Sequence, residues 1–184
     1  MVTVNNLVVQ AIVAQLPCLD AAIARFDQQL AALFQQHPDR EIFQSLPGAG
    51  PALDPALRDA FGSRRDRFQQ AQEIEQLSGI APVTKRSGKS LYIHRRFACS
   101  KFLRQTFHEY AEQSISKSTW ARAYYQLQRS RGKGYHAAVR ALAFKWIRII
   151  FRCWKDNTLY NEEQYLQALR RRNSPLVPLL QASA

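Results

Sequence analysis

The first forty residues carry the most regular hydrophobic pattern in the chain. Apolar residues alternate at spacings of three and four, at Val9, Ile12, Leu16, Leu19, Ile23, Phe26, Leu30 and Leu33. This is the a/d pattern of a coiled coil, which brings each apolar side chain to the same face of a helix. It predicts a coiled-coil helix over residues 1–38 that dimerises or spaces domains. One amphipathic helix packed on its own domain is the alternative, and Pro17 predicts a kink or a restart.

A second pattern, over residues 42–62, indicates two short helices joined by a glycine turn. The sequence FQSLPGAGPALDPALRDAFG places Gly48 and Gly50 directly before an apolar helical segment. This is typical of a helix-hairpin-helix, in which free backbone N–H groups at the start of the second helix meet a phosphate. A plain glycine turn is the alternative, and the acidic Asp54 and Asp59 count against close phosphate contact.

The helical spacing of apolar residues is interrupted over residues 79–98 and returns from residue 100 to residue 172. In the interruption, Leu91 and Ile93 alternate with more polar residues, which predicts an extended segment or short β-hairpin. We therefore expect a mainly α protein with a β-hairpin near residues 83–97.

The expected organisation has three parts. The coiled-coil helix occupies residues 1–38, a compact helical domain occupies residues 41–174, and residues 175–184 form a flexible tail. The helical domain comprises the helix-hairpin-helix, the serine-containing loop at 79–98 and the basic helices at 100–172.

Charge is distributed unevenly along the 184 residues. The whole chain has a formal net charge of +12, whereas residues 1–62 hold three basic and six acidic residues. From Lys85 to Lys155, seventeen basic residues face only Glu109 and Glu112. Such a one-sided field is typical of a nucleic-acid-binding protein, and a solvated basic surface without a ligand is the alternative.

The longest basic helix is predicted over residues 136–154. At 100° per residue, its cations fall within about 140° of arc, opposite the apolar face. The cations on this stripe are Arg140, Lys145, Arg148, Arg152 and Lys155. We expect Arg140, Arg148 and Arg152 to contact a phosphate backbone.

The stretch KRSGKSLYIHRR contains Gly88-Lys89-Ser90, the ending of a nucleotide-binding P-loop. The P-loop glycine that should stand five positions before Gly88 is replaced by Val83, and no apolar strand precedes it, so this interpretation fails. Two serines, Ser87 and Ser90, remain as nucleophiles for attack on a phosphodiester. The cations expected to hold the phosphate are Lys85, Arg86, Lys89, Arg95 and Arg96.

The other chemistry-bearing residues indicate no cofactor. The three cysteines are an odd number at wide spacing, and His94 and Cys99 form the nearest approach to a metal-ligand pair, so we expect neither disulfides nor a metal. No uninterrupted apolar run reaches the roughly 18 residues of a membrane span. We expect a cytoplasmic protein without membrane contact.

Four segments together resemble a known family. These are FQSLPGAGP, LSGIAPVTKRSGKS, CSKFLRQTFHEYA and RGKGYHAAVRALAFKWIRIIFRCWKDNTLY. In this order they resemble the C-terminal, transposase half of the DEDD-type insertion-sequence transposases, which are bridge-RNA-guided recombinases of bacterial mobile elements. The resemblance covers about residues 42–160 and extends to the preceding coiled coil.

The resemblance implies a DNA transposase, with Ser87 as the nucleophile that forms a transient phosphoserine link to DNA. Ser90 is the weaker candidate. The implied partners are DNA, a guide RNA and further copies of the chain joined through the coiled coil, and the implied location is the bacterial cytoplasm, in association with the nucleoid. In the family, a preceding resolvase-like domain supplies four acidic ligands for divalent metal ions. No such acidic set precedes the coiled coil here, so we expect this chain alone to bind nucleic acid without recombining DNA.

Two alternatives from other functional classes stay open. One is a non-catalytic DNA- or RNA-binding module in which Ser87 only forms a turn. The other is a coiled-coil interaction protein with an incidental basic surface, whose binding to nucleic acid would show little salt dependence.

Overall fold

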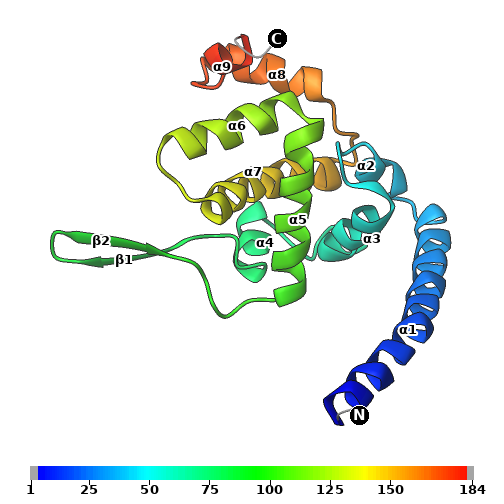
Figure 1. Ribbon diagram of the computed structural model, residues 1–184. Coiled ribbons are helices and arrows are strands. Elements are labelled where there is room, and N and C mark those ends of the chain that lie inside the picture. The colour runs from blue at the N-terminus through cyan, green and yellow to red at the C-terminus, as the bar shows by residue number, and fades with distance from the viewer. Residues whose placement is uncertain (1–3, 182–184) are drawn as a thin grey trace. The chain divides into compact units, whose positions relative to one another are not determined.

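Nine helices and one two-stranded sheet make up residues 4–181, the part of the chain that the computed structural model describes (Figure 1). The helices are α1 (Val4–Gln35), α2 (Arg40–Gln44), α3 (Gly50–Phe61), α4 (Ala71–Leu77), α5 (Lys101–Lys117), α6 (Thr119–Ser130), α7 (Tyr135–Asp156), α8 (Glu162–Arg171) and α9 (Val177–Gln181). The strands are β1 (Val83–Ser87) and β2 (Ser90–His94). The predictions of a mainly α fold and a short hairpin near residues 83–97 are confirmed. The chain divides into two units, Met1–His37 and Pro38–Ala184.

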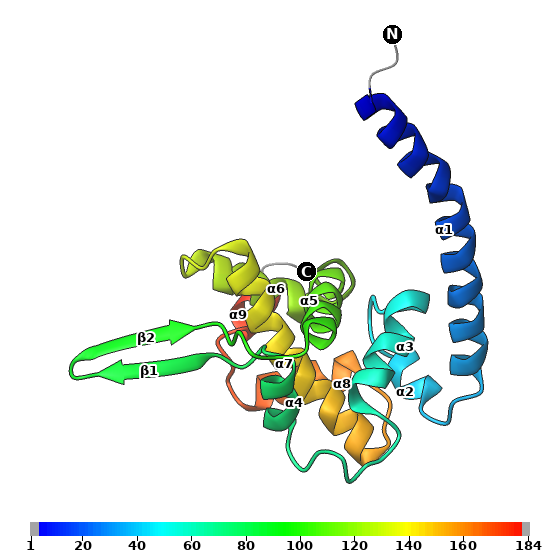
Figure 2. The ribbon, with the colours of Figure 1, turned by 90° about the horizontal axis from the view of Figure 1, so that it is seen from below.

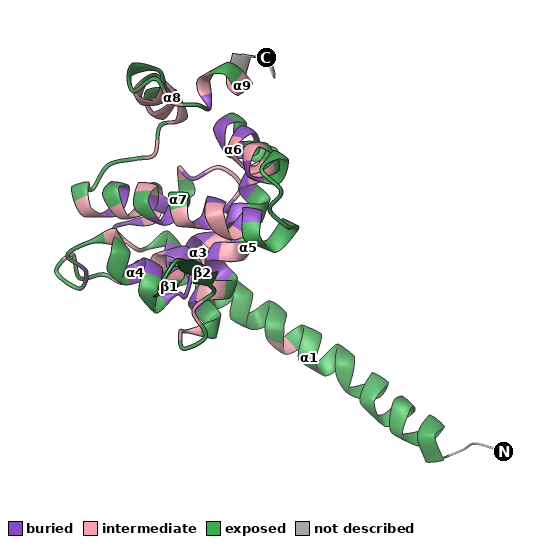
Figure 3. Cartoon of the chain, turned by 90° about the vertical axis from the view of Figure 1, so that its left-hand side faces the viewer, coloured by how far each residue is buried: buried purple, intermediate pink, exposed green. Residues whose placement is uncertain are grey.

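Helix α1 runs without interruption through Pro17, although proline removes one hydrogen bond of the helix ladder. The eight apolar residues of the a/d pattern are between 49% and 70% exposed in the single chain (Figure 3). The apolar face of α1 is thus present and accessible. Its pairing in a coiled coil stays a prediction.

The same helix is long and apolar enough to cross a membrane. A window of 18 residues within Val4–Gln35 has a mean hydropathy of 1.8. This differs from the expectation based on uninterrupted apolar runs, because a window average tolerates scattered residues such as Gln10 and Gln15. A signal sequence has the same length and composition, so these properties do not by themselves establish a membrane span.

Helix α7 lies at the centre of the Pro38–Ala184 unit, where it packs against α2, α4, α5 and α6. Its apolar face is buried along the whole helix, and Trp146 and Trp154 are fully buried. The Trp146 ring lies 4.7 Å from that of Trp120 on α6 and 5.1 Å from that of Tyr110 on α5. These large rings bury much apolar area and join α5, α6 and α7.

Each buried indole of this core has a hydrogen-bond acceptor. Trp146 Nε1 donates to Ser114 Oγ at 2.7 Å, and Trp120 Nε1 donates to the Tyr160 hydroxyl at 2.7 Å. Trp154 Nε1 donates to the backbone carbonyl of Gly62 at 3.1 Å. The core therefore avoids the cost of a buried N–H group without an acceptor.

Polar residues mark the beginnings of three helices. Ser100 caps α5, Ser118 caps α6 and Asn161 caps α8, each accepting a hydrogen bond from a backbone N–H in the first turn. Between α4 and α5 the chain extends away from the helical body, forms the hairpin of β1 and β2, and returns to the body at α5.

The C-terminal segment contains a short helix where the sequence predicted a flexible tail. Helix α9 packs on α6, and Leu176 just before it is 5% exposed. Apolar burial of this kind holds a terminal segment in place. Residues 182–184 of the predicted tail lie outside the described residues.

Candidate nucleic-acid interface

The hairpin β1–β2 projects from the helical body of its unit (Figure 1), and Figure 2 shows the same projection from below. A two-residue turn, Gly88-Lys89, connects its strands, and Ser87 pairs with Ser90 across the last position. Gly88 has a φ of +56°, in the left-handed region, whereas the φ of Lys89 is not positive. This combination is a type II′ turn, which matches the twist of the strands and favours glycine at its first position. The glycine after Ser87 thus follows from the turn geometry.

Ser87 and Ser90 both lie at the tip of the hairpin and are exposed. Among the described residues, neither hydroxyl has a hydrogen-bond partner, so both are accessible to an incoming phosphate. Within residues 4–181, no carboxylate or imidazole forms a hydrogen bond with either serine hydroxyl.

The strand register divides the expected phosphate-binding cations between two faces. Successive residues of a strand point to opposite faces, so Lys85 lies on the face of Ser87 and Arg86 on the opposite face. Lys89 lies in the turn beside both serines. The structure therefore brings Lys85 and Lys89 to the serines, and directs Arg86 away from them.

Arg95 and Arg96 lie at the other end of the hairpin. They follow the last strand residue, His94, and four residues of a strand span about 13 Å, so they stand far from Ser90. The Arg95 guanidinium lies 4.8 Å from the centre of the Phe97 ring. Arg96 Nε is buried and has no hydrogen-bond partner among the described residues. The cation ring expected around Ser87 is thus split between the tip and the root of the hairpin.

Arg140 on α7 is within electrostatic range of two other arginines, Arg95 after the hairpin and Arg104 on α5. Burial, followed by the nearby charges of Arg95 and Arg104, lowers the pKa of Arg140. Within the described residues none of these three arginines has an acidic partner. Three guanidinium groups without a carboxylate favour the binding of an anion such as phosphate.

Arg148 and Arg152 have acidic partners. Arg148 Nε donates to Glu75 Oε1 at 2.6 Å, and Arg152 Nε lies 3.6 Å from Asp156 Oδ2. These two predicted phosphate contacts are therefore partly neutralised within the protein. The sequence pattern placed them on the correct helix face but did not reveal Glu75, which lies 73 residues away.

Gly48 and Gly50 both have positive φ, +81° and +68°, in the turn before α3. A Cβ at Gly48 would lie 3.1 Å from the Gln113 carbonyl oxygen and 3.1 Å from Lys117 Cγ on α5, whereas a Cβ at Gly50 would meet no atom within 4 Å. Gly48 therefore permits close packing of the turn on α5. Gly50 is exposed at the first residue of α3, where free N–H groups favour an anion.

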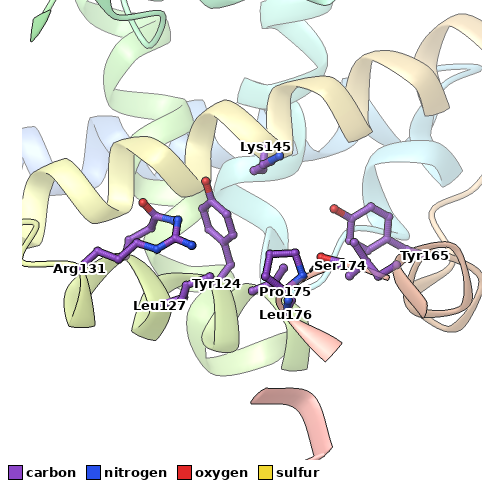
Figure 4. Close-up of a pocket in the computed structure, with 10 residues that line it drawn as sticks. Tyr124, Leu127, Arg131, Lys145, Tyr165, Ser174, Pro175 and Leu176 are labelled. Atoms are coloured by element: carbon purple, nitrogen blue, oxygen red, sulfur yellow. Dashed lines mark hydrogen bonds between the residues drawn. The ribbon is translucent and has the colours of Figure 1, made fainter. Parts of the chain in front are cut away.

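A cavity of about 280 Å³ lies between α6, α7, α8 and the following segment (Figure 4), and no sequence pattern predicted it. Lys145 Nζ lies 5.8 Å from the Tyr124 ring centre, and burial raises the pKa of Tyr124 and Tyr165. Arg131 also lines this cavity. Lys145 of the predicted basic stripe thus faces the cavity.

The described residues contain no cluster of three or more histidine, cysteine, aspartate or glutamate side chains able to hold a metal ion. Cys18 is exposed, Cys99 is half-buried and Cys153 is buried, and all three are free thiols. The candidate interface therefore consists of serines, cations and aromatic rings.

Residues 40–126 match the model of the family described as Transposase IS116/IS110/IS902 family. This region includes the glycine turn, the hairpin and helix α5. It supports the coarser part of the resemblance, a similarity to insertion-sequence transposases.

Relatives encoded by insertion elements show the same similarity. The chain is 30% identical to the "Mini-circle putative transposase for IS117" of Streptomyces coelicolor over 176 residues, 94% of this chain and 40% of that protein. It is 28% identical to the "Insertion element IS110 uncharacterized 43.6 kDa protein" of the same species, over 84% of this chain and 38% of the relative. It is 29% identical to the "Insertion element IS900 uncharacterized 42 kDa protein" of Mycobacterium paratuberculosis, over 84% of this chain and 39% of that protein. The chain thus spans about 40% of the length of these relatives.

Proposed function

We propose that this chain is the DNA-binding and strand-transfer part of an insertion-element transposase, with Ser87 as its nucleophile. The similarity to proteins of insertion elements supports transposition as the process. The observation that carries the residue assignment is the position of Ser87. It stands exposed at the tip of a projecting hairpin, beside Lys85 and Lys89 and without an acidic neighbour.

The proposed step is an exchange of one phosphate ester bond for another. Ser87 Oγ attacks the phosphorus of a DNA phosphodiester and loses its proton to a base, while the bond from phosphorus to one sugar oxygen breaks. The departing sugar oxygen takes up a proton and leaves as a hydroxyl. Attack by another sugar hydroxyl on the serine ester reverses the step and joins a new strand.

Lys85 and Lys89 are proposed to stabilise the negative charge that builds on the non-bridging oxygens during this attack. Arg95, Arg104 and Arg140 are proposed to hold a second phosphate of the same DNA at the root of the hairpin. Because about 13 Å separate the two groups along the strand, they are suited to different phosphates rather than to one.

We infer that activity needs more than the 184 residues of this chain. Within the described residues no base forms a hydrogen bond with the Ser87 hydroxyl, and the resemblance implies metal-binding carboxylates in another domain. We also infer that a guide RNA and other copies of the chain take part, as the resemblance implies. We expect the chain alone to bind DNA and not to exchange strands.

Detection of covalent protein–DNA adducts tests the nucleophile. In a protein completed with the remaining part of the IS117 relative, Ser87→Ala should abolish adducts while DNA affinity stays within about twofold. Ser90→Ala is the matched control, because Ser90 lies directly opposite with a similar exposed hydroxyl, and its adducts should persist. Adducts that persist in Ser87→Ala would contradict the assignment and favour a non-catalytic binding module.

A further inference from the structure

The two faces of the hairpin differ in chemistry. The face that carries Ser87 and Ser90 also carries the cross-strand pair Lys85–Tyr92 and, next along the strand, His94. We call this the serine face. The opposite face carries the pairs Thr84–Ile93 and Arg86–Leu91.

Two exposed aromatic rings lie next to each other on the serine face. The rings of Tyr92 and His94 have centres 6.3 Å apart and an angle of 23° between their planes. Tyr92 is 58% exposed, so this ring pair is not part of the protein core. Exposed, nearly parallel aromatic rings offer a surface on which a planar ligand can stack.

The distance between Tyr92 and the serines determines which ligands can contact both the Tyr92 ring and a serine hydroxyl. Tyr92 stands two residues after Ser90 on the same strand, a separation of about 7 Å. Successive bases of a nucleic-acid strand rise by about 3.4 Å, so a base within about two steps of the attacked phosphate reaches the Tyr92 ring.

Charge on the hairpin favours the same ligand. Residues 79–98 contain Lys85, Arg86, Lys89, Arg95 and Arg96 and no aspartate or glutamate. A polyanion is therefore attracted along the whole hairpin, and cations interleaved with aromatic residues are typical of surfaces that bind single-stranded nucleic acid.

We propose that Tyr92 and His94 stack on an unpaired base of the DNA strand whose phosphate Ser87 attacks, and so position that phosphate at the hairpin tip. This inference rests on the proposed function of Ser87. The base is unpaired because neighbours in a duplex cover both faces of a stacked base, and side chains stack on bases that have left the stack. Tyr92 and His94 are thus positioning residues.

Fluorescence anisotropy of the full chain with a 20-nucleotide oligothymidine tests this proposal. Tyr92→Ala and Tyr92→Leu should each weaken binding about tenfold, because leucine keeps apolar bulk but has no aromatic face. Tyr92→Phe should bind within about twofold of the unsubstituted protein. Ile93→Ala is the matched control, because Ile93 is 68% exposed on the opposite face of the same strand, and its affinity should stay within about twofold.

A second measurement locates the stacked base directly. Oligothymidine with 5-iodouracil substitutions, irradiated in the complex, should crosslink to the peptide that contains Tyr92 and His94. A 20-base-pair duplex should bind Tyr92→Ala and the unsubstituted protein equally within about twofold.

The outcomes separate this inference from the function on which it rests. If the unsubstituted chain binds no DNA, or binds with little salt dependence, the proposed function fails and the inference with it. If the chain binds with strong salt dependence but Tyr92→Ala and Tyr92→Leu bind normally, only the inference fails. An equal loss in Ile93→Ala would also overturn it, because the effect would then follow from the hairpin as a whole.

Discussion

Arg148 Nε donates a hydrogen bond of 2.6 Å to Glu75 Oε1, and the Glu75 side chain is 1% exposed. The partner of a buried carboxylate contributes to stability, since without it the charge has neither water nor a cation. We expect Arg148→Ala to lower the free energy of unfolding by about 2 kcal/mol, less than for a fully buried pair because Arg148 is half exposed. Urea unfolding followed by circular dichroism measures this change.

Arg152→Ala is the control for this prediction. Arg152 lies on the same helix and has an ion pair with Asp156, but both side chains are exposed. Exposed pairs contribute little, so its effect should stay below about 0.5 kcal/mol. Equal effects of the two substitutions would contradict a special role of the Glu75 contact.

DNA binding should depend on Arg140 more than on Arg148. Arg140 lies beside Arg95 and Arg104 without an acidic partner among the described residues, whereas Glu75 already neutralises Arg148. Arg140→Gln should reduce the slope of log Kd against log salt concentration by about one, the effect of losing one phosphate contact. Arg148→Gln, in a preparation verified to be folded, should leave the slope nearly unchanged. The reverse order would show that α7 binds DNA along its whole cationic stripe.

Local signals were enough to predict much of the fold and part of the site. The cap residues Ser100, Ser118 and Asn161, and the alternation around Tyr92, act over a few residues and are visible in the sequence. The family resemblance directed attention to Ser87, and the structure places that serine at an exposed turn.

Contacts between residues far apart in the sequence could not be predicted from such local signals. The neutralisation of Arg148 depends on Glu75, which only the packing of α4 against α7 brings close. The pairing of Lys85 with Tyr92 depends on strand register, because a shift of one residue would bring a residue of the opposite set beside Lys85. The sequence pattern therefore predicted which residues are basic but not which of them act together.

The buried carboxylate of Asp54 predicts a dependence of stability on pH. Burial raises the pKa of Asp54 from its ordinary value of 3.8 to about 6, and its Oδ1 atom has no hydrogen-bond partner among the described residues. Between these two values the folded state binds more protons than the unfolded state, so the contribution of Asp54 to stability decreases as pH rises from about 4 to about 6. Asp54→Asn removes this titration. Its gain in stability over the unsubstituted chain, about 1 kcal/mol at pH 7.5, should largely disappear at pH 4.5.

Thermal unfolding of both proteins at the two pH values measures the difference. Asp59→Asn is the matched control, since the Asp59 side chain on the same helix is 70% exposed. A stabilisation of Asp54→Asn that is equal at pH 4.5 and pH 7.5 would show that the carboxylate charge is not the cause.

The two glycines before α3 should respond differently to alanine. Both have positive φ, which costs about 1–2 kcal/mol for an L-residue, but only Gly48 lies against the backbone of α5. Gly48→Ala should therefore destabilise the protein more than Gly50→Ala, by at least about 1 kcal/mol in urea unfolding. If the turn also binds phosphate as a helix-hairpin-helix, Gly50→Ala should weaken DNA binding by more than its effect on stability explains. Equal stability of the two variants would show that α5 moves to accommodate the new methyl group.

Association of the chain should depend on the apolar face of α1. Ile23 stands at an a position of the pattern and is 56% exposed in the single chain, so a charge there costs little in a monomer and much in a coiled-coil interface. Ile23→Asp should raise the dissociation constant of a dimer at least about 100-fold, since two buried isoleucine side chains are lost. Gln28→Asp introduces the same charge on the opposite side of the helix and should leave the dissociation constant of the dimer nearly unchanged. Sedimentation equilibrium measures both. A chain that stays monomeric at all concentrations but floats with liposomes would replace the coiled coil with a membrane-binding helix, consistent with the hydropathy of Val4–Gln35.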